Sequence, residues 1–527
     1  MHSLTTRLRR SHWPHQYLSP RPAPTVVLLV LGTLLVVGSA GCGKDVTEIV
    51  GTLDLPGSYR LESQEQLENL RGVRRIHGSL ELRGTGILDL SPLSDLEYAA
   101  NLRFDACDAL GDLRGLGALH EAGVLQVYRC SGLDDLSGLE SLQLAETIEI
   151  SENNGLQDLG GLAALESVGT LQVDWNPSLT SVEGLLSLAA ADRLILLSNA
   201  VLPDLRGLGD LRTAGTLSVR GNPSLESLTG LESLRTLSAL VIEENAQLGT
   251  LEGLESLEEL GSFTVQNQAL VSLEGMDGVT SLTTASFRAL PLLQSLAGLG
   301  SLREAEAIEI VECPALNNLA GLASLERLGE LRLTSCPNFL RFTGLENLTE
   351  LGGIALTDMS AFMDYRGGTL PPIVSLKLER MPVSALPALT YADTLQLIQL
   401  TDNIGLYDLT ALGGAEVLQA LVLQNQPALE SLEPLAGTEI RSHLEIRDCP
   451  GITSLSGLGR VTSLDHLWLR NDDALVSLAG LSNLELVSGS LEVTRNGNLC
   501  QSAIDEWLSQ VEVTGTTTLD SNAECLR

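Results

Sequence analysis

The chain has 527 residues, with 32 lysines and arginines against 67 aspartates and glutamates, and a formal net charge of −35. Nucleic acid is therefore not an expected partner, because binding its phosphates requires a basic face. Aromatic residues make up only 3% of the chain, which argues against a platform that stacks on sugar rings.

Residues 1–41 have the parts of a signal peptide. The first 24 positions contain four arginines and no acidic residue, a twelve-residue apolar run follows at 26–37, and Ser39-Ala40-Gly41-Cys42 comes next. The apolar run is too short to span a bilayer. We therefore expect the protein to be exported and not integral to a membrane.

The small residues before Cys42 resemble the lipobox of bacterial lipoproteins, in which the cysteine becomes the acylated first residue of the mature chain. The resemblance implies lipidation of Cys42 and a membrane anchor, with residues 42–57 as tether and N-terminal cap. Ser39 stands where the lipobox usually has leucine, and ordinary secretion after Ala40 or Gly41 is the alternative. The expected location is the cell envelope, at the outer membrane or cell surface.

One pattern repeats through residues 58–498. The residue before the leucine in S-x-x-G-L recurs from Asn69 to Gly480 in steps of 21 to 23, nearly all of them 23, which gives nineteen copies. A fixed period of this size indicates a solenoid, in which each repeat packs against its neighbours. We predict a mainly β solenoid of about 19 rungs of 23 residues, with one long parallel sheet.

Each rung should contain a short strand, a slot for a small side chain, and further apolar walls. Leu171 and Val173 alternate with polar residues, as in a strand with one buried face. Leu185 should stack between the equivalent leucines of the adjacent rungs, Leu162 and Leu208. The slot after the strand holds asparagine or cysteine: Asn176, Asn199, Asn222, Asn245, Cys107, Cys130, Cys313, Cys336 and Cys449.

Two pairs of these cysteines, Cys107 with Cys130 and Cys313 with Cys336, occupy the slot one rung apart. Stacked strands lie about 4.8 Å apart, a spacing that a disulfide tolerates. Disulfides between rungs and buried free thiols are both compatible with this spacing. Cys449 has no cysteine in the slot of an adjacent rung, and we predict that it is a core residue.

The period fails between residues 357 and 394, where one step is 21 residues and three of the five methionines occur. A functional loop is one interpretation, because irregular segments often carry contacts. We interpret the stretch as a seam between two arrays.

Residues 499–527 lie outside the repeat and read as a C-terminal cap, which repeat arrays need to cover the last rung. Ser502 to Gln510 resembles a short helix, with Ile504, Trp507 and Leu508 on one face. Cys500 and Cys525 bracket it, and in an oxidising compartment we expect them to form a disulfide.

The opening SYRLESQEQLENLRGVRRIHGSLELRG (58–84), the repeated G-x-L-x-V-x-x-N-P-x-L-x-S-L and the ending NLCQSAIDEW resemble the receptor L-domain of growth-factor and insulin receptors. The rung is also similar to internalin-type leucine-rich repeats, echoed at 90–93 and 432–435. The resemblance covers 58–527, longer than one L-domain, and lacks the cysteine-rich modules of the receptors. It implies a right-handed coil that binds ligands rather than catalyses reactions.

The outward positions of the strands are mixed in charge and character, which favours a specific partner over a repetitive polymer. Tryptophan and arginine are enriched at binding hot spots. We therefore take Glu445, Arg447, Trp468 and Arg470 as the candidate ligand-contact patch, although scattered surface residues would give the same pattern.

No catalytic, cofactor-binding or metal site is expected. The chain has no G-x-S-x-G, H-E-x-x-H or P-loop motif. His443 and His466, 23 residues apart beside Asp465, should stack on adjacent rungs, but two imidazoles without a committed third ligand make a poor zinc site. The predicted function is non-enzymatic binding of a protein or envelope ligand through the exposed face of the array; the alternative is a structural spacer without a specific ligand.

Overall fold

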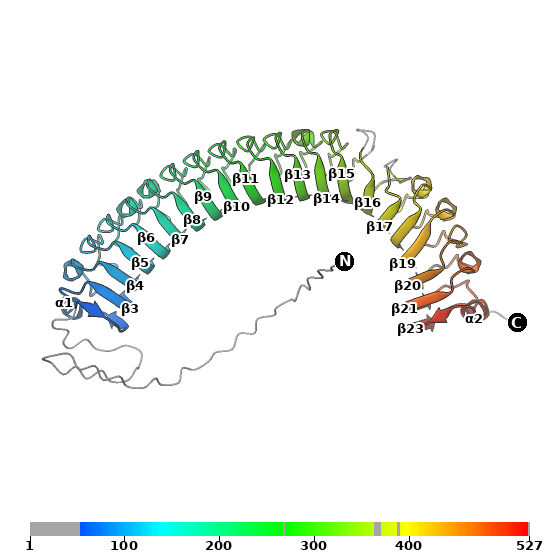
Figure 1. Cartoon of the computed structure of the whole chain (residues 1–527), viewed down its shortest axis with the longest axis horizontal. Coiled ribbons are helices and arrows are strands. Elements are labelled where there is room, and N and C mark those ends of the chain that lie inside the picture. Colours follow the sequence, from blue (N-terminus) through cyan, green and yellow to red (C-terminus); the bar gives the residue numbers. More distant parts are fainter. Residues whose placement is uncertain (1–52, 267–268, 363–369, 387–389, 525–527) are drawn as a thin grey trace, which may run out of the picture.

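The computed structural model describes residues 53–266, 269–362, 370–386 and 390–524. The signal peptide, Cys42 and Cys525 lie outside these ranges. The described strands form one 23-stranded sheet, and neighbouring rungs pair in parallel, as between β6 and β7. The array bends into an arc with the strands along its inner side and the turns along its outer side (Figure 1). We call the inner side the concave face.

Nineteen strands correspond to the nineteen predicted rungs. They are β3 Arg75–Arg83, β4 Tyr98–Asp105, β5 Glu121–Tyr128, β6 Leu144–Ser151, β7 Ser167–Asp174, β8 Ala190–Leu197, β9 Thr213–Arg220, β10 Thr236–Glu243, β11 Glu259–Gln266, β12 Ser281–Arg288, β13 Glu304–Val311, β14 Arg327–Thr334, β15 Glu350–Thr357, β16 Ile373–Glu379, β17 Thr394–Thr401, β18 Val417–Gln424, β19 Glu439–Arg447, β20 Ser463–Arg470 and β21 Leu486–Thr494.

Adjacent rungs stack with a register of one repeat. Leu171 of β7 pairs with Ile148 of β6 and Leu194 of β8, and all three side chains are fully buried. Leu162, Leu185 and Leu208 are also fully buried. Several outer turns contain a short 3₁₀ helix, such as η2 Gly160–Leu162 and η3 Glu183–Leu185. The predicted register and solenoid are confirmed.

A residue in the left-handed backbone region ends nearly every strand. Trp175, for example, has φ 55° and follows β7, and Ala106, Arg129 and Glu152 hold the same place in earlier rungs. This conformation is uncommon for residues other than glycine. Here it turns the chain toward the interior, while the Trp175 N–H donates to Leu197 O on the next rung at 2.9 Å.

The slot after this turn carries a ladder of amide side chains. Asn199 Oδ1 accepts the N–H of Asn176 at 3.2 Å, and Asn199 Nδ2 donates to Val173 O at 2.9 Å. Asn153, which the sequence prediction did not name, belongs to the same ladder. The five cysteines in the slot are buried free thiols, so the structure contains no disulfide between those rungs.

Three strands carry an extra residue. β3, β19 and β21 have nine residues, whereas β4–β18 and β20 have seven or eight, and the pairings of β3 with β4, β18 with β19 and β20 with β21 shift register. Such bulges redirect side chains and are frequent near functional sites. All three lie toward the ends of the array.

The predicted seam does not interrupt the sheet. β16 pairs in parallel with both β15 and β17, although it is one residue shorter than they are. Residues 363–369 and 387–389 within this stretch lie outside the described ranges. The strand pairing thus continues through the described part of this stretch.

The N-terminal end begins earlier than expected. β1 (Asp54–Leu55), inside the predicted tether, and β2 (Tyr59–Leu61) both pair with β3. Helix α1 (Gln64–Glu68) follows, with a capping box in which Ser63 Oγ accepts the Gln66 N–H. The first full rung is thus covered by a short strand and a capped helical turn.

The C-terminal cap contains the predicted helix as α2 (Gln501–Leu508). Trp507 is 8% exposed, and its Nε1 donates to Leu481 O at 3.2 Å. Beyond it, β22 (Glu512–Val513) and β23 (Thr516–Asp520) pair with β21 and extend the sheet. Cys500 pairs with Ala523 in a parallel bridge; Cys525 lies outside the described residues, and the Cys500–Cys525 disulfide stays a prediction.

Candidate functional site

The four residues of the predicted contact patch lie together on the concave face. Glu445 and Arg447 stand on β19, and each is the register partner of a patch residue on β20, Trp468 and Arg470 respectively. Because alternate strand residues point to the same side, the four side chains form one two-by-two patch. We call this the C-terminal patch.

Trp468 is held in place by neighbours that the sequence prediction did not include in the patch. Its Nε1 donates to Ser490 Oγ at 2.8 Å, and its ring meets the His443 ring edge-on with centroids 4.8 Å apart. Ser490 Oγ also lies 2.8 Å from His466 Nδ1. The tryptophan is therefore fixed before any partner arrives, which lowers the entropy cost of binding.

A glycine in the β21 bulge makes room for this arrangement. A Cβ on Gly489 would lie 2.7 Å from His466 Cε1 and 2.6 Å from the carbonyl oxygen of Asp465. Any larger residue would displace the imidazole that contacts Ser490. The absence of a side chain at Gly489 in the bulge therefore leaves the space that the His466 ring occupies.

Glu445 is an outward residue that the structure nearly buries, with 9% exposed. Its Oε2 lies 3.4 Å from His443 Nε2, and the hydrogen bond to His443, with the nearby positive charge of Arg447, lowers the pKa of Glu445. The carboxylate therefore stays ionised and orients both neighbours.

A cavity of about 460 Å³ adjoins the patch between β19 and β23. Arg470 donates to Glu492 Oε1 through two nitrogens, at 2.8 and 2.6 Å. Arg447 Nε is buried, with no hydrogen-bond partner among the described residues, and lies 3.8 Å from Glu445 Oε1. Arg495, on the same wall, forms no ion pair within the described chain.

The histidine pair does not make a metal site. The rings of His443 and His466 meet edge-on with centroids 5.8 Å apart, and Asp465 accepts hydrogen bonds from Ser442 and Ser488. Within the described ranges, no group of three His, Cys, Asp or Glu side chains is placed to hold a metal ion.

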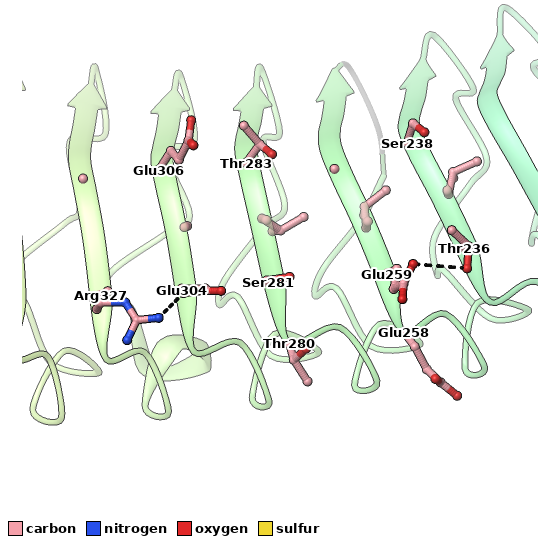
Figure 2. A pocket seen from close by; sticks show the side chains of 16 residues that line it. Thr236, Ser238, Glu258, Glu259, Thr280, Ser281, Thr283, Glu304, Glu306 and Arg327 are labelled. Atoms are coloured by element: carbon pink, nitrogen blue, oxygen red, sulfur yellow. Dashed lines mark hydrogen bonds and ion pairs between the residues drawn. The ribbon is translucent and has the colours of Figure 1, made fainter. Parts of the chain in front are cut away.

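A cavity of about 930 Å³ lies over the N-terminal ends of β10–β14. Figure 2 shows it as an open shelf, with Glu304 directed at Arg327 on the next strand and Thr236 at Glu259. Glu258 is paired with Arg235 at 2.6 Å. The shelf is lined mainly by polar side chains, some of which are paired with one another.

The structure thus brings together all four predicted patch residues and adds His443, His466, Ser490 and Glu492. The 23-residue spacing of His443 and His466 already indicated that these two side chains lie side by side on adjacent strands. The sequence did not place Ser490 beside His466, because the extra residue in β21 shifts the register of this strand by one.

No helix in the described ranges is long and apolar enough to span a membrane. The chain matches no protein-family model and no curated protein. Solved structures that it resembles include the internalin InlF of Listeria monocytogenes, at 17% identity over 66% of this chain and 87% of that one, with a TM-score of 0.33.

A leucine-rich repeat protein of Leptospira interrogans aligns at 15% identity over 72% of this chain and 93% of its own, with a TM-score of 0.36. The TLR13-ssRNA13 complex aligns at 15% identity over 88% and 80%, with a TM-score of 0.38. The architecture of this chain, a parallel coil of leucine-rich rungs, is that of leucine-rich repeat proteins. What it binds has to be inferred from its own side chains.

Proposed function

We propose that this chain is an exported, non-enzymatic protein of the cell envelope, anchored by lipid on Cys42, whose concave face binds a protein or envelope ligand. The C-terminal patch, Glu445, Arg447, Trp468 and Arg470, makes the central contacts. The observation that supports this proposal most is that Trp468 is held by its hydrogen bond to Ser490 near a cavity lined by Arg447. The Nε of Arg447 is buried without a hydrogen-bond partner in the described chain.

Several features support binding as the role of this patch. A tryptophan flanked by arginines is the composition of interface hot spots. The side chains are fixed by internal contacts, so little rotamer freedom remains to be lost on association. On the concave face, β17 carries the neutral residues Gln399 and Thr401, and Gln399 gives a control position away from the patch.

Cross-linking of the full-length chain in intact cells tests the binding role. A photoreactive phenylalanine derivative at position 468 should give a discrete covalent adduct after irradiation, while the same group at Gln399 should give none. Equal adducts at both positions, or none at 468, would contradict the proposal and favour a spacer without a ligand.

The lipid anchor has a separate test. Cys42→Ala should release the protein from the membrane fraction and abolish metabolic labelling with palmitate. Unchanged labelling and membrane partitioning of this variant would refute lipidation at Cys42, and the cross-linking result would still stand.

A further inference from the structure

Three arginines surround one buried aspartate at the N-terminal end of the concave face. Asp105, the last residue of β4, has a side chain 4% exposed. Arg129 Nη2 donates to its Oδ1 at 2.7 Å, while Arg83 Nε and Arg103 Nη2 lie 3.6 and 3.7 Å from its Oδ2. We call Arg83, Arg103 and Arg129 the arginine cluster. One carboxylate cannot saturate three guanidinium groups, which together offer fifteen N–H donors at about five each.

The guanidinium group of Arg103 is only partly hydrogen-bonded within the described chain. Its one hydrogen bond within the described chain goes to Gln126 Oε1 at 3.3 Å, and Glu81 Oε1 is 3.9 Å from its Nε. That Nε is buried without a hydrogen-bond partner, and so is Asn101 Oδ1, two residues earlier on β4. Native proteins rarely leave such atoms unsatisfied. Within the described chain, Arg103 Nε therefore lacks an acceptor and Asn101 Oδ1 lacks a donor.

Tyr128 fixes the guanidinium groups in position. The Arg129 guanidinium carbon lies 4.5 Å from the Tyr128 ring centroid and that of Arg103 lies 5.7 Å from it, both within cation–π range. The Tyr128 hydroxyl donates to Glu152 Oε1 at 2.6 Å. The ring is thus covered by arginines and is not available to stack on a sugar.

A cavity of about 320 Å³ opens beside the cluster, with Arg103 and Tyr128 on its wall next to Gln126, Glu149 and Gln172. Gln126 Nε2 donates to Glu149 Oε2 at 2.6 Å, which satisfies one oxygen of this carboxylate without changing its charge. Side-chain amides both donate and accept, so they match the peptide groups of an extended chain. The bulge of β3 lies directly beside β4, as the β21 bulge lies beside Trp468.

We propose that the arginine cluster binds a carboxylate side chain of an acidic polypeptide segment, with the backbone of that segment along Gln126 and Gln172. A carboxylate accepts two parallel N–H bonds from a guanidinium. Asp105 holds the cluster together without neutralising it. The site is separate from the C-terminal patch, so a partner that contacts both would span the arc.

Binding of fluorescein-labelled hexaglutamate to the full-length chain, followed by fluorescence anisotropy at low salt, tests the proposal. Wild type should bind despite its negative net charge. Arg103→Gln should weaken binding about tenfold or more, as should Arg129→Gln, because each removes a charged donor. Arg288→Gln removes the same charge from the concave face on β12, where Arg288 pairs with Glu309, and should change binding less than about twofold.

Thermal unfolding of each variant separates lost binding from lost folding, and Arg129→Gln provides a second reading if Arg103→Gln is unstable. No binding by wild type, or equal losses for Arg103→Gln and Arg288→Gln, would overturn the proposal. Polyglucuronate that competes as well as hexaglutamate would overturn the peptide assignment. Trp468→Ala should bind hexaglutamate normally, so failure of the C-terminal patch and failure of this site are distinguishable.

Discussion

Two segments of the array fill the same slot in different ways. From Asn153 to Asn245 the slot holds an unbroken run of asparagines, each bonded to its neighbour. Between Leu290 and Met381 it holds leucine, cysteine or methionine, all nearly or fully buried. The strands of both segments have eight residues, except β16, which has seven. The backbone of the coil therefore accepts either a polar ladder or an apolar filling.

The two segments differ in how the backbone N–H and C=O groups at the turn are hydrogen-bonded. In the amide segment, each asparagine accepts a main-chain N–H and donates to a main-chain carbonyl of the preceding rung, as Asn199 does. In the apolar segment, Cys336 Sγ lies 4.0 Å from Ile310 O, a weak contact. A hydrogen bond adds about 1 kcal/mol net, so the amide segment should open more rarely than the apolar one.

The largest expected effect comes from breaking the ladder. Asn199→Leu leaves the N–H of Asn176 and the carbonyl of Val173 buried without partners, at about 1–3 kcal/mol each, and should destabilise the array by roughly 4 kcal/mol. Hydrogen exchange of rungs β7 and β8 should accelerate first. The matched change Cys336→Leu should cost much less; equal costs would mean that the ladder adds no stability.

The buried carboxylate of Asp472 tests a polar side chain in the slot through the pH dependence of the stability of the array. It occupies the slot between Cys449 and Asn496; its Oδ1 accepts the Cys449 N–H at 2.8 Å, while Oδ2 is buried without a partner in the described chain. Burial raises the pKa of Asp472 to about 8, from about 3.9 when unfolded.

Because its pKa is raised on folding, Asp472 contributes stability that is fully present below about pH 4 and is lost as the pH rises to about 8. The loss should amount to several kcal/mol. Urea unfolding of wild type and Asp472→Asn across this range measures it: the variant keeps the Oδ1 acceptor, gains an N–H donor and should lack this pH dependence. A variant that weakens in parallel with wild type would contradict the raised pKa.

The smallest effect should come from extending the ladder. Cys336→Asn places an amide where Oδ1 can accept the Cys313 N–H and Nδ2 can donate to Ile310 O, by the register of Asn199. We expect about 1 kcal/mol of added stability, measured by thermal unfolding against Cys336→Ser, whose shorter side chain cannot reach both groups. Destabilisation by the asparagine would show that the apolar segment has no room for an amide.

The candidate site was only partly predictable. The repeat arithmetic placed Glu445 opposite Trp468 and Arg447 opposite Arg470, and the structure confirms both pairings. The arithmetic did not place Ser490 beside His466, because one inserted residue in β21 shifts the register of this strand. It also did not reveal that Arg129 reaches Asp105, because Arg129 lies in the left-handed turn and not on a strand.

By itself, the sequence determined the coil: the 23-residue period set the register of the strands, and the alternation around Leu171 and Val173 set which side chains point inward, because local apolar spacing dictates burial in a repeat. Only the tertiary structure decided which polar side chains lose water. Asp105 and Asp174 have the spacing of exposed residues, yet both are buried on the concave face. Neighbouring rungs stack close enough for long side chains to cover them, and that packing depends on residues one repeat away in the sequence.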